Sequence, residues 1–296
     1  MTNSTNAAGY LANVVKKYAI NDASPEATQM QAARKRVEES IRAKFGSTPH
    51  IRYGGSYMKG TMVRTSYDLD ILCYLPRDAN DAGETLEEIF KNVQSALEKD
   101  YHVDPKRTAL RLAEKGGGTL HIDVVPGRFV DESETTVFLH QNEGDKSYLQ
   151  TNPDIHKDHV AGSGVLDAIR LVKVWRDLMA ISAKTFVLEL LVIKLLKDYK
   201  NEALDKQIER VFTAFRDQTD SLAVEDPANG NNDLRPLLDE MRGALAAAAA
   251  QTLAQAEQGG WEAVFGSVEG SAGQDYARRV QGAVAADTTR VKPWAI

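Results

Sequence analysis

The sequence lacks the features that mark secreted or membrane-bound chains. Among its 296 residues there is one cysteine, Cys73, so no internal disulfide and no zinc site made of clustered cysteines can form. The first ten residues, MTNSTNAAGY, hold neither a basic region nor an apolar segment, and we expect no signal peptide. No apolar run approaches the length that spans a bilayer. We therefore expect a cytoplasmic protein with no membrane partner, in which Cys73 is a small buried apolar group.

An excess of basic residues is also missing. The chain has 36 Lys and Arg against 42 Asp and Glu, which gives a formal net charge of -6. A protein whose main ligand is duplex DNA or RNA normally presents a basic face. The charge balance therefore disfavours duplex nucleic acid as the main ligand. Hydrophobic residues make up 43% of the chain, which is enough for a sizeable core in two domains.

The first half of the chain mixes helices and strands. Ser24 is a suitable N-cap, and Pro25 suits the first position of the helix that follows. Beyond a central stretch at 51–76, the sequence predicts a third helix, then strands around a glycine turn. The predicted helices cover 6–21, 25–45 and 83–99, and the predicted strands cover 107–112, 119–125 and part of 128–140.

The second half of the chain is predicted to have a different secondary structure. Residues 141–162 are polar and predicted to be irregular, and the chain is then almost wholly helical. The expected helices cover 164–180, 184–200, 203–219, 234–257 and 271–285. We therefore predict an α+β protein, with N-terminal helices and a core of strands and helices in residues 1–160 and an all-helical domain in residues 161–296.

The central stretch, IRYGGSYMKGTMVRTSYDLDILCYLP, is typical of a strand, a glycine turn, a short helix and a second strand. Asp68 and Asp70 lie two residues apart on the second strand. Because side chains alternate across a strand, both carboxylates face one way while Leu69 and Ile71 enter the core. Two neighbouring carboxylates need a cation between them, and Mg²⁺ prefers carboxylate and phosphate oxygens.

The glycine turn, Gly54-Gly55-Ser56, provides a complementary feature. Glycine lets the backbone approach a phosphate closely, and the Ser56 hydroxyl and nearby amides can hold phosphate oxygens. Asp123, which faces away from Ile122 and Val124 on a later strand, is a candidate third metal ligand. A pair of ions held by Asp68, Asp70 and Asp123 suits in-line displacement at phosphorus. Each feature alone is more often an ordinary surface carboxylate or loop, and their combination is what favours metal-dependent nucleotidyl transfer.

These residues resemble the nucleotidyltransferase superfamily that includes DNA polymerase beta. The shared pattern is Gly55-Ser56, a gap of eleven residues, Asp68-Leu69-Asp70-Ile71 and the distant Asp123. Downstream, residues 169–175 (IRLVKVW) and 186–191 (FVLELL) resemble the spine helix of oligoadenylate synthetase and the segment after it. Asp226-Pro227 with Asn231-Asn232 resembles the Asp-Pro loop of the same domain. Together with Gly60-Thr61, these motifs resemble the bacterial relatives of cyclic GMP-AMP synthase, the CD-NTases of antiphage signalling.

The resemblance implies a polymerase-beta-like palm beside a helical lobe, with the active site in a cleft between the two. It implies that Lys173 and Thr185 contact the terminal phosphates of a donor nucleotide and that Phe186 stacks on its base. Glu189 is interpreted as a structural helix residue. The implied reaction joins ATP and other nucleoside triphosphates into a cyclic di- or trinucleotide with release of pyrophosphate. The implied cofactor is a pair of Mg²⁺ ions, with Mn²⁺ as a substitute.

The resemblance and the charge balance together lead to expectations about partners. Activation by duplex nucleic acid is disfavoured, which leaves constitutive activity or a regulatory protein partner, and we expect a monomer. Residues 291–296 could be a C-terminal attachment handle, but an ordinary frayed end is the simpler interpretation. The alternatives within the enzyme class are a linear oligonucleotide product, addition of nucleotides to RNA as in tRNA CCA addition, and transfer of AMP to a drug or protein. A catalytically silent nucleotide-binding scaffold is the alternative of another class.

Overall fold

Seven strands form one mixed sheet in the computed structural model, which describes residues 4–117, 120–144 and 146–269. The main path runs β1-β2-β5-β4-β3, and β6 and β7 continue from the second half of β5. β2 and β5 pair in parallel, and every other pair is antiparallel. The strands are β1 (His50–Tyr53), β2 (Asp68–Leu75), β3 (Tyr101–Pro105), β4 (Leu110–Glu114), β5 (His121–Phe129), β6 (Val137–His140) and β7 (Tyr148–Thr151).

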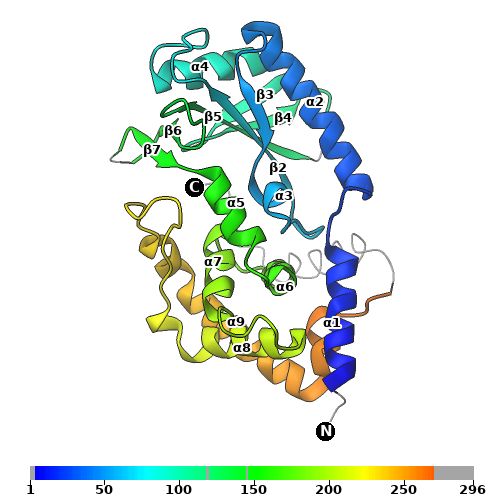
Figure 1. Ribbon diagram of the computed structural model, residues 1–296. Coiled ribbons are helices and arrows are strands. Elements are labelled where there is room, and N and C mark those ends of the chain that lie inside the picture. The colour runs from blue at the N-terminus through cyan, green and yellow to red at the C-terminus, as the bar shows by residue number, and fades with distance from the viewer. Residues whose placement is uncertain (1–3, 118–119, 145, 270–296) are drawn as a thin grey trace, which may run out of the picture.

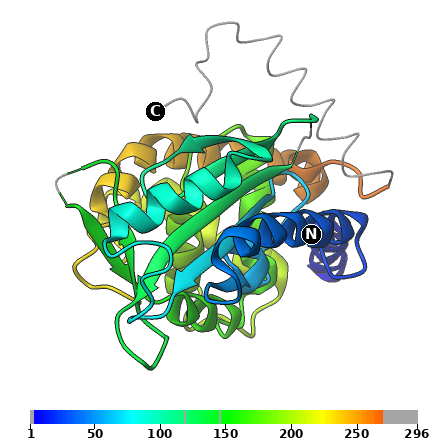
Figure 2. The ribbon, with the colours of Figure 1, turned by 90° about the horizontal axis from the view of Figure 1, so that it is seen from above.

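Two helices, α2 (Pro25–Phe45) and α4 (Leu86–Leu97), cover one face of this sheet (Figures 1 and 2). The alternating apolar residues of β2, including Leu69, Ile71 and Cys73, point to that face and are fully buried, as predicted. α4 begins with a capping box, in which Thr85 and Glu88 satisfy each other's backbone amides. The opposite face, which carries Asp68 and Asp70, has a much smaller apolar cluster and is therefore available for chemistry.

The remaining helices pack together in a second core around Trp175, which is fully buried and donates a hydrogen bond from its indole nitrogen to Thr252 at 2.7 Å. The N-terminal helix packs into this second core and not against the sheet, as Figure 1 also shows. The helices of this part are α1 (Ser4–Tyr18), α5 (Pro153–Ala161), α6 (Leu166–Leu178), α7 (Thr185–Leu195), α8 (Leu204–Asp217), η1 (Thr219–Ser221) and α9 (Arg235–Phe265).

The sheet and the helical part meet along residues 60–67, which connect the short helix α3 (Gly55–Lys59) to β2. In this connector Val63 belongs to the helical core and forms an isolated bridge with Ala19 at the end of α1. The Arg64 guanidinium donates to the backbone oxygens of Lys17 and Ala19 at 2.7 and 2.8 Å. The segment that leads into Asp68 is therefore fastened to the helical part.

Several details differ from the sequence-based expectations. Residues 141–162 are not irregular, because they form β7 and α5, and β3 was not predicted at all. Ser24 occupies the N-cap of α2, but its hydroxyl makes no capping bond there and instead accepts from Arg64 at 3.1 Å. The alanine-rich helix runs past residue 257 to Phe265, with a kink at Gly260, whose backbone is not helical and has a φ of 69°.

Two further predictions, the helix at 271–285 and the tail at 291–296, lie outside the described residues. The domain boundary near residue 160 stays a prediction. Among the helices that the structure describes, none is both long enough and apolar enough to span a membrane.

Candidate active site

Asp68 and Asp70 lie at the start of β2, on the face that α2 and α4 leave uncovered. Asp68 is exposed and Asp70 is half-buried, while Leu69 between them is fully buried. This arrangement follows from the alternation of the strand, and it agrees with the direction expected from the sequence. The two predicted metal ligands therefore share one surface.

Asp123 is the direct neighbour of Asp70, because the parallel register of β2 and β5 pairs these two residues. On the other side of β5, the antiparallel register of β4 places Arg111 opposite Asp123. The Arg111 guanidinium donates to both carboxylate oxygens, from Nε to Oδ1 at 2.9 Å and from Nη2 to Oδ2 at 2.6 Å. The third predicted ligand is thus beside the first two, with its oxygens turned to an arginine that the sequence analysis did not identify.

The glycine turn lies directly against Asp70. The Gly54 amide donates to the Asp70 backbone oxygen at 2.9 Å, which carries the pairing of β1 and β2 into the turn. Gly55 has a φ of 52°, and a Cβ on it would lie 1.6 Å from the Asp70 Oδ2. Only glycine fits there, because any side chain would collide with the carboxylate. The turn then leads into α3, with half-buried Ser56 in its first turn.

The crowding of carboxylates has an electrostatic cost. Burial, followed by the neighbouring Asp123 and Asp68, raises the pKa of Asp70 to about 7. Protein atoms around the Asp68 carboxylate, which still reaches solvent on one side, and then the charge of Asp123 also raise the pKa of Asp68. The hydrogen bonds to Asp123 raise the pKa of Arg111. A cation at Asp68 and Asp70 would relieve this repulsion, so the electrostatics favour a bound positive charge.

The oxygen donors of this site suit Mg²⁺, which is a hard cation. Nevertheless, within the described residues no three His, Cys, Asp or Glu side chains are arranged so that they could hold a metal ion together. In the structure Asp123 directs both oxygens to Arg111. The carboxylate oxygens therefore suit a metal chemically, while those of Asp123 are bonded to Arg111.

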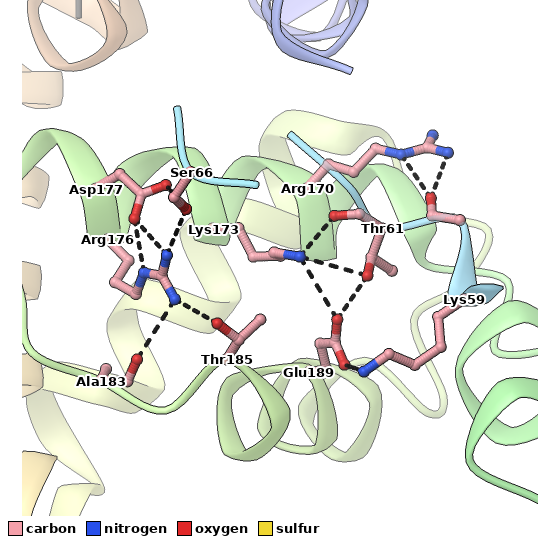
Figure 3. A network of polar contacts seen from close by, with 11 residues as sticks. Lys59, Thr61, Ser66, Arg170, Lys173, Arg176, Asp177, Ala183, Thr185 and Glu189 are labelled. Atoms are coloured by element: carbon pink, nitrogen blue, oxygen red, sulfur yellow. Dashed lines mark hydrogen bonds and ion pairs between the residues drawn. The ribbon is translucent and has the colours of Figure 1, made fainter. Parts of the chain in front are cut away.

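Lys173, the predicted phosphate contact on α6, lies in a buried network between the two parts of the molecule (Figure 3). Its side chain is 3% exposed, and its ammonium donates to the Thr61 backbone oxygen at 2.7 Å. The Glu189 carboxylate on α7 lies 3.8 Å from this ammonium, accepts from the Thr61 hydroxyl at 2.6 Å and forms an ion pair with Lys59. Burial lowers the pKa of Lys173 to about 8, against the opposing effect of Glu189.

Thr185, the other predicted phosphate contact, starts α7. Its hydroxyl accepts a hydrogen bond from Arg176, whose guanidinium also donates to the Ser66 hydroxyl at 2.7 Å and pairs with Asp177 (Figure 3). The Asp177 carboxylate accepts from Ser66 as well, at 2.6 Å. Arg176 and Asp177 therefore hold the segment before Asp68 and the start of α7 to the end of α6.

Phe186, the predicted base-stacking residue, is half-buried beside His156 of α5, with 4.9 Å between ring centres. The His156 imidazole contacts the Asp226 carboxylate at 2.7 Å, and Asn232 donates to the same carboxylate at 2.7 Å. The Asp-Pro loop thus orients the histidine that packs on Phe186. Burial favours the protonated form of Asp226, but the hydrogen bonds from His156 and Asn232 lead to a lowered pKa.

The structure therefore brings the predicted residues to one region and adds others to it. Those that the sequence analysis missed are Lys59, Arg111, His156 and Arg176. Two of these four residues could have been identified from their spacing in the sequence. Lys59 follows Ser56 by three residues on the predicted short helix, and Arg111 alternates with buried Leu110 and Leu112 on a predicted strand.

Two cavities formed by described residues of the helical part lie elsewhere. Each encloses about 430 Å³; one is lined by Asp167, Arg170 and Gln207, the other by Tyr199 and Arg210 among others. None of the predicted site residues lines either one. The predicted cleft between the two parts of the molecule is therefore not one of these cavities.

Comparison with known proteins gives a family match over half of the chain. The profile of the Second Messenger Oligonucleotide or Dinucleotide Synthetase domain, SMODS, matches residues 9–163. This range includes the glycine turn and all three predicted metal ligands. No curated protein matches the chain.

Solved structures match at low sequence identity. A chain in the E. coli MS115-1 CdnC:HORMA-deltaN complex is 19% identical, with a TM-score of 0.68 over 90% of this chain and 100% of that chain. Bradyrhizobium diazoefficiens CD-NTase CdnG in complex with GTP is 14% identical, with a TM-score of 0.64 over 93% and 98%. Vibrio cholerae DncV cyclic AMP-GMP synthase with a linear intermediate is 18% identical, with a TM-score of 0.60 over 89% and 85%. These likenesses establish the α+β fold with a helical C-terminal part.

Substitution of Asp70 by asparagine should stabilise the metal-free protein in a pH-dependent way. The folded state holds the pKa of Asp70 above its ordinary value of 3.8, at about 7, so folding disfavours the charged form. The free energy of unfolding of the wild type therefore falls as the pH rises from about 4 to about 7, and Asp70→Asn escapes this loss. We expect the variant to be more stable by roughly 1–3 kcal/mol at pH 8, and by less at pH 5.

Urea unfolding in EDTA at pH 5, 6, 7 and 8 measures this difference. Asp78→Asn is the control, because the Asp78 side chain is 87% exposed and the change should leave stability nearly constant. An Asp70→Asn variant that is less stable than the wild type at pH 8 would contradict the electrostatic account.

Proposed function

This chain belongs to the SMODS family of second messenger oligonucleotide or dinucleotide synthetases, and we propose that it joins nucleoside triphosphates into a cyclic di- or trinucleotide with release of pyrophosphate. It is a nucleotidyltransferase of the kind that makes cyclic oligonucleotides. The observation that carries the proposal is the contact of the Gly54–Ser56 turn with Asp70, whose cross-strand neighbour is Asp123. This contact places a phosphate-binding turn against carboxylates that need a cation.

Asp68, Asp70 and Asp123 are the proposed metal ligands and catalytic residues. Two Mg²⁺ ions, for which Mn²⁺ can substitute, would stabilise the attacking and leaving oxygens of an in-line displacement at the α-phosphorus. Asp68 and Asp70 share one face of β2 for this purpose. Asp123 would join them if its oxygens turned from Arg111, its bonded neighbour on β4.

The triphosphate of the donor nucleotide is proposed to lie along the turn. The Gly55 backbone and the Ser56 hydroxyl, at the start of α3, would hold phosphate oxygens. Lys173 on α6 and Thr185 at the start of α7 would act on the terminal phosphates. Phe186, held by His156, would stack on the donor base. The chain's own residues thereby orient the α-phosphorus for attack by a ribose hydroxyl.

ATP is the proposed donor, and other nucleoside triphosphates are proposed as further substrates. Solved relatives support this choice, since CdnC was determined with ATP and CdnG with GTP. The CdnC complex with a HORMA protein supports activation through a protein partner. We propose a cytoplasmic monomer that such a partner regulates.

Loss of either β2 carboxylate should abolish product formation. Asp68→Ala and Asp70→Ala each remove a negative charge that the proposed ions require, and we expect a loss of at least about 1,000-fold in turnover. The assay incubates the protein with labelled ATP, GTP, CTP and UTP and Mg²⁺ or Mn²⁺, then with phosphatase. A resistant product indicates a cycle, and a sensitive one indicates a linear oligomer.

The exposed Asp78→Ala serves as the matched control and should keep full activity. Circular dichroism should show all three variants folded. Product formation by Asp68→Ala or Asp70→Ala would refute the assignment of the site. A wild type that makes no product, alone or with a co-encoded partner, would favour the silent scaffold.

Antiphage signalling is the proposed biological role, as the resemblance to CD-NTases implies. If the product protects cells from phage, protection should require an intact active site. Bacteria that express the wild-type chain with its neighbouring genes should plate phage less efficiently than bacteria with Asp70→Ala. Equal plating of several phages on both strains would argue against this role.

A further inference from the structure

Two lysines share one carboxylate in the buried network between the sheet and the helical part (Figure 3). The side chains of Lys59, Lys173 and Glu189 are 11%, 3% and 0% exposed. The Glu189 Oε2 pairs with Lys59, and its Oε1 lies 3.8 Å from the Lys173 ammonium. Burial favours the protonated form of Glu189, but the two lysines outweigh it and lower the pKa of this carboxyl. The network therefore carries one positive charge more than its carboxylate can balance, which is costly in a buried place.

Lys59 lies near three parts of the proposed donor site. It follows Ser56 by three residues on α3, so both side chains lie on one face of that helix. Its ammonium lies 5.7 Å from the centre of the Phe186 ring, and its positive charge favours the ionised form of Asp70. Lys59 therefore borders the proposed phosphate turn, the proposed base-stacking ring and a proposed metal ligand.

Lys173 differs from Lys59 in its surroundings. Its ammonium donates to the Thr61 backbone oxygen at 2.7 Å and lies 3.5 Å from the Thr61 hydroxyl, so it fastens the connector to α6. In this network the polar contact of Lys59 is with Glu189. Because an ammonium has three N–H donors, Lys59 can also donate to a further acceptor. Lys59 is also the more exposed of the two. Of the two lysines, Lys59 can exchange its partner without loosening the connector.

We infer that Lys59 is a phosphate-contacting residue for the donor nucleoside triphosphate, and that Glu189 holds its ammonium until the phosphates take over that charge. The inference rests on the proposed function and assigns a residue of the same site. Because Lys59 lies on α3 and Glu189 lies on α7, the exchange acts on the contact between the sheet and the helical part. The phosphates add the negative charge that the network lacks.

The experiment measures binding of a non-hydrolysable ATP analogue and of AMP, each with Mg²⁺, by calorimetry. Lys59→Gln keeps a hydrogen-bond donor for Glu189 but removes the charge. We expect the variant to bind the ATP analogue at least about tenfold more weakly and to bind AMP within about twofold of the wild type, because the lost contact is to the outer phosphates. Lys91→Gln, on the exposed surface of α4, is the matched control and should bind both as the wild type does.

Glu189→Gln supplies an independent readout. Without its carboxylate, two buried ammonium groups lose their counter-charge, so the melting temperature should fall in the absence of nucleotide. The ATP analogue should then raise the melting temperature by more than it does in the wild type. This larger shift distinguishes charge exchange from a merely structural ion pair, which would give the same shift in both proteins.

The outcomes separate this inference from the function on which it rests. If the wild type binds the ATP analogue and Lys59→Gln binds it equally well, or loses affinity for AMP to the same extent, the inference is overturned alone. If the wild type itself binds no ATP analogue, the proposed function fails and the inference fails with it.

Discussion

Repulsion between carboxylates is the constraint on which the candidate site depends. The parallel pairing of β2 and β5 sets Asp70 beside Asp123, and the strand alternation sets Asp68 on the same face. The other face of the sheet is apolar and buried under α2 and α4. This burial stabilises the fold and offsets the cost of the repulsion between the carboxylates. In the absence of a bound cation, Arg111 balances Asp123, while Asp70 is driven towards its protonated form. Without ligands the charges of such a site are poorly balanced, and bound cations and phosphates would complete it.

The second requirement is that the sheet and the helical part keep a fixed position relative to each other at the site. Two buried polar networks do this, one around Glu189 and one around Arg176 and Asp177 (Figure 3). Both fasten the connector between the phosphate turn and Asp68 to helices α6 and α7. Buried ion pairs contribute little net stability but specify one arrangement where each polar group is satisfied. The helical part therefore does more than cover the sheet, because it positions the segment that leads to the carboxylates.

Much of this arrangement follows from local sequence. The alternation of Asp68, Leu69, Asp70 and Ile71 fixed which side chains face the core, and the structure agrees. The family resemblance is confirmed, because the SMODS match covers the glycine turn and the carboxylates, while the spine-helix motif at 169–175 lies beyond the matched range. What could not be predicted depends on tertiary pairing. Arg111 meets Asp123 only through the register of β4. Glu189, interpreted from the sequence as a structural helix residue, lies between two lysines that are distant from it in the chain. The roles of the site residues stay predictions.

The central claim is that Asp68, Asp70 and Asp123 together hold the ions for nucleotidyl transfer. A crystal structure of the full chain with Mn²⁺ and a non-hydrolysable ATP analogue tests it directly, since anomalous scattering locates manganese independently of the atomic model. The account predicts anomalous peaks at about 2.0–2.2 Å from oxygens of Asp68 and Asp70, the spacing of small hard cations, with Asp123 released from at least one bond to Arg111. Bound analogue without manganese at these carboxylates, or with Asp123 still paired through both oxygens to Arg111, would contradict it.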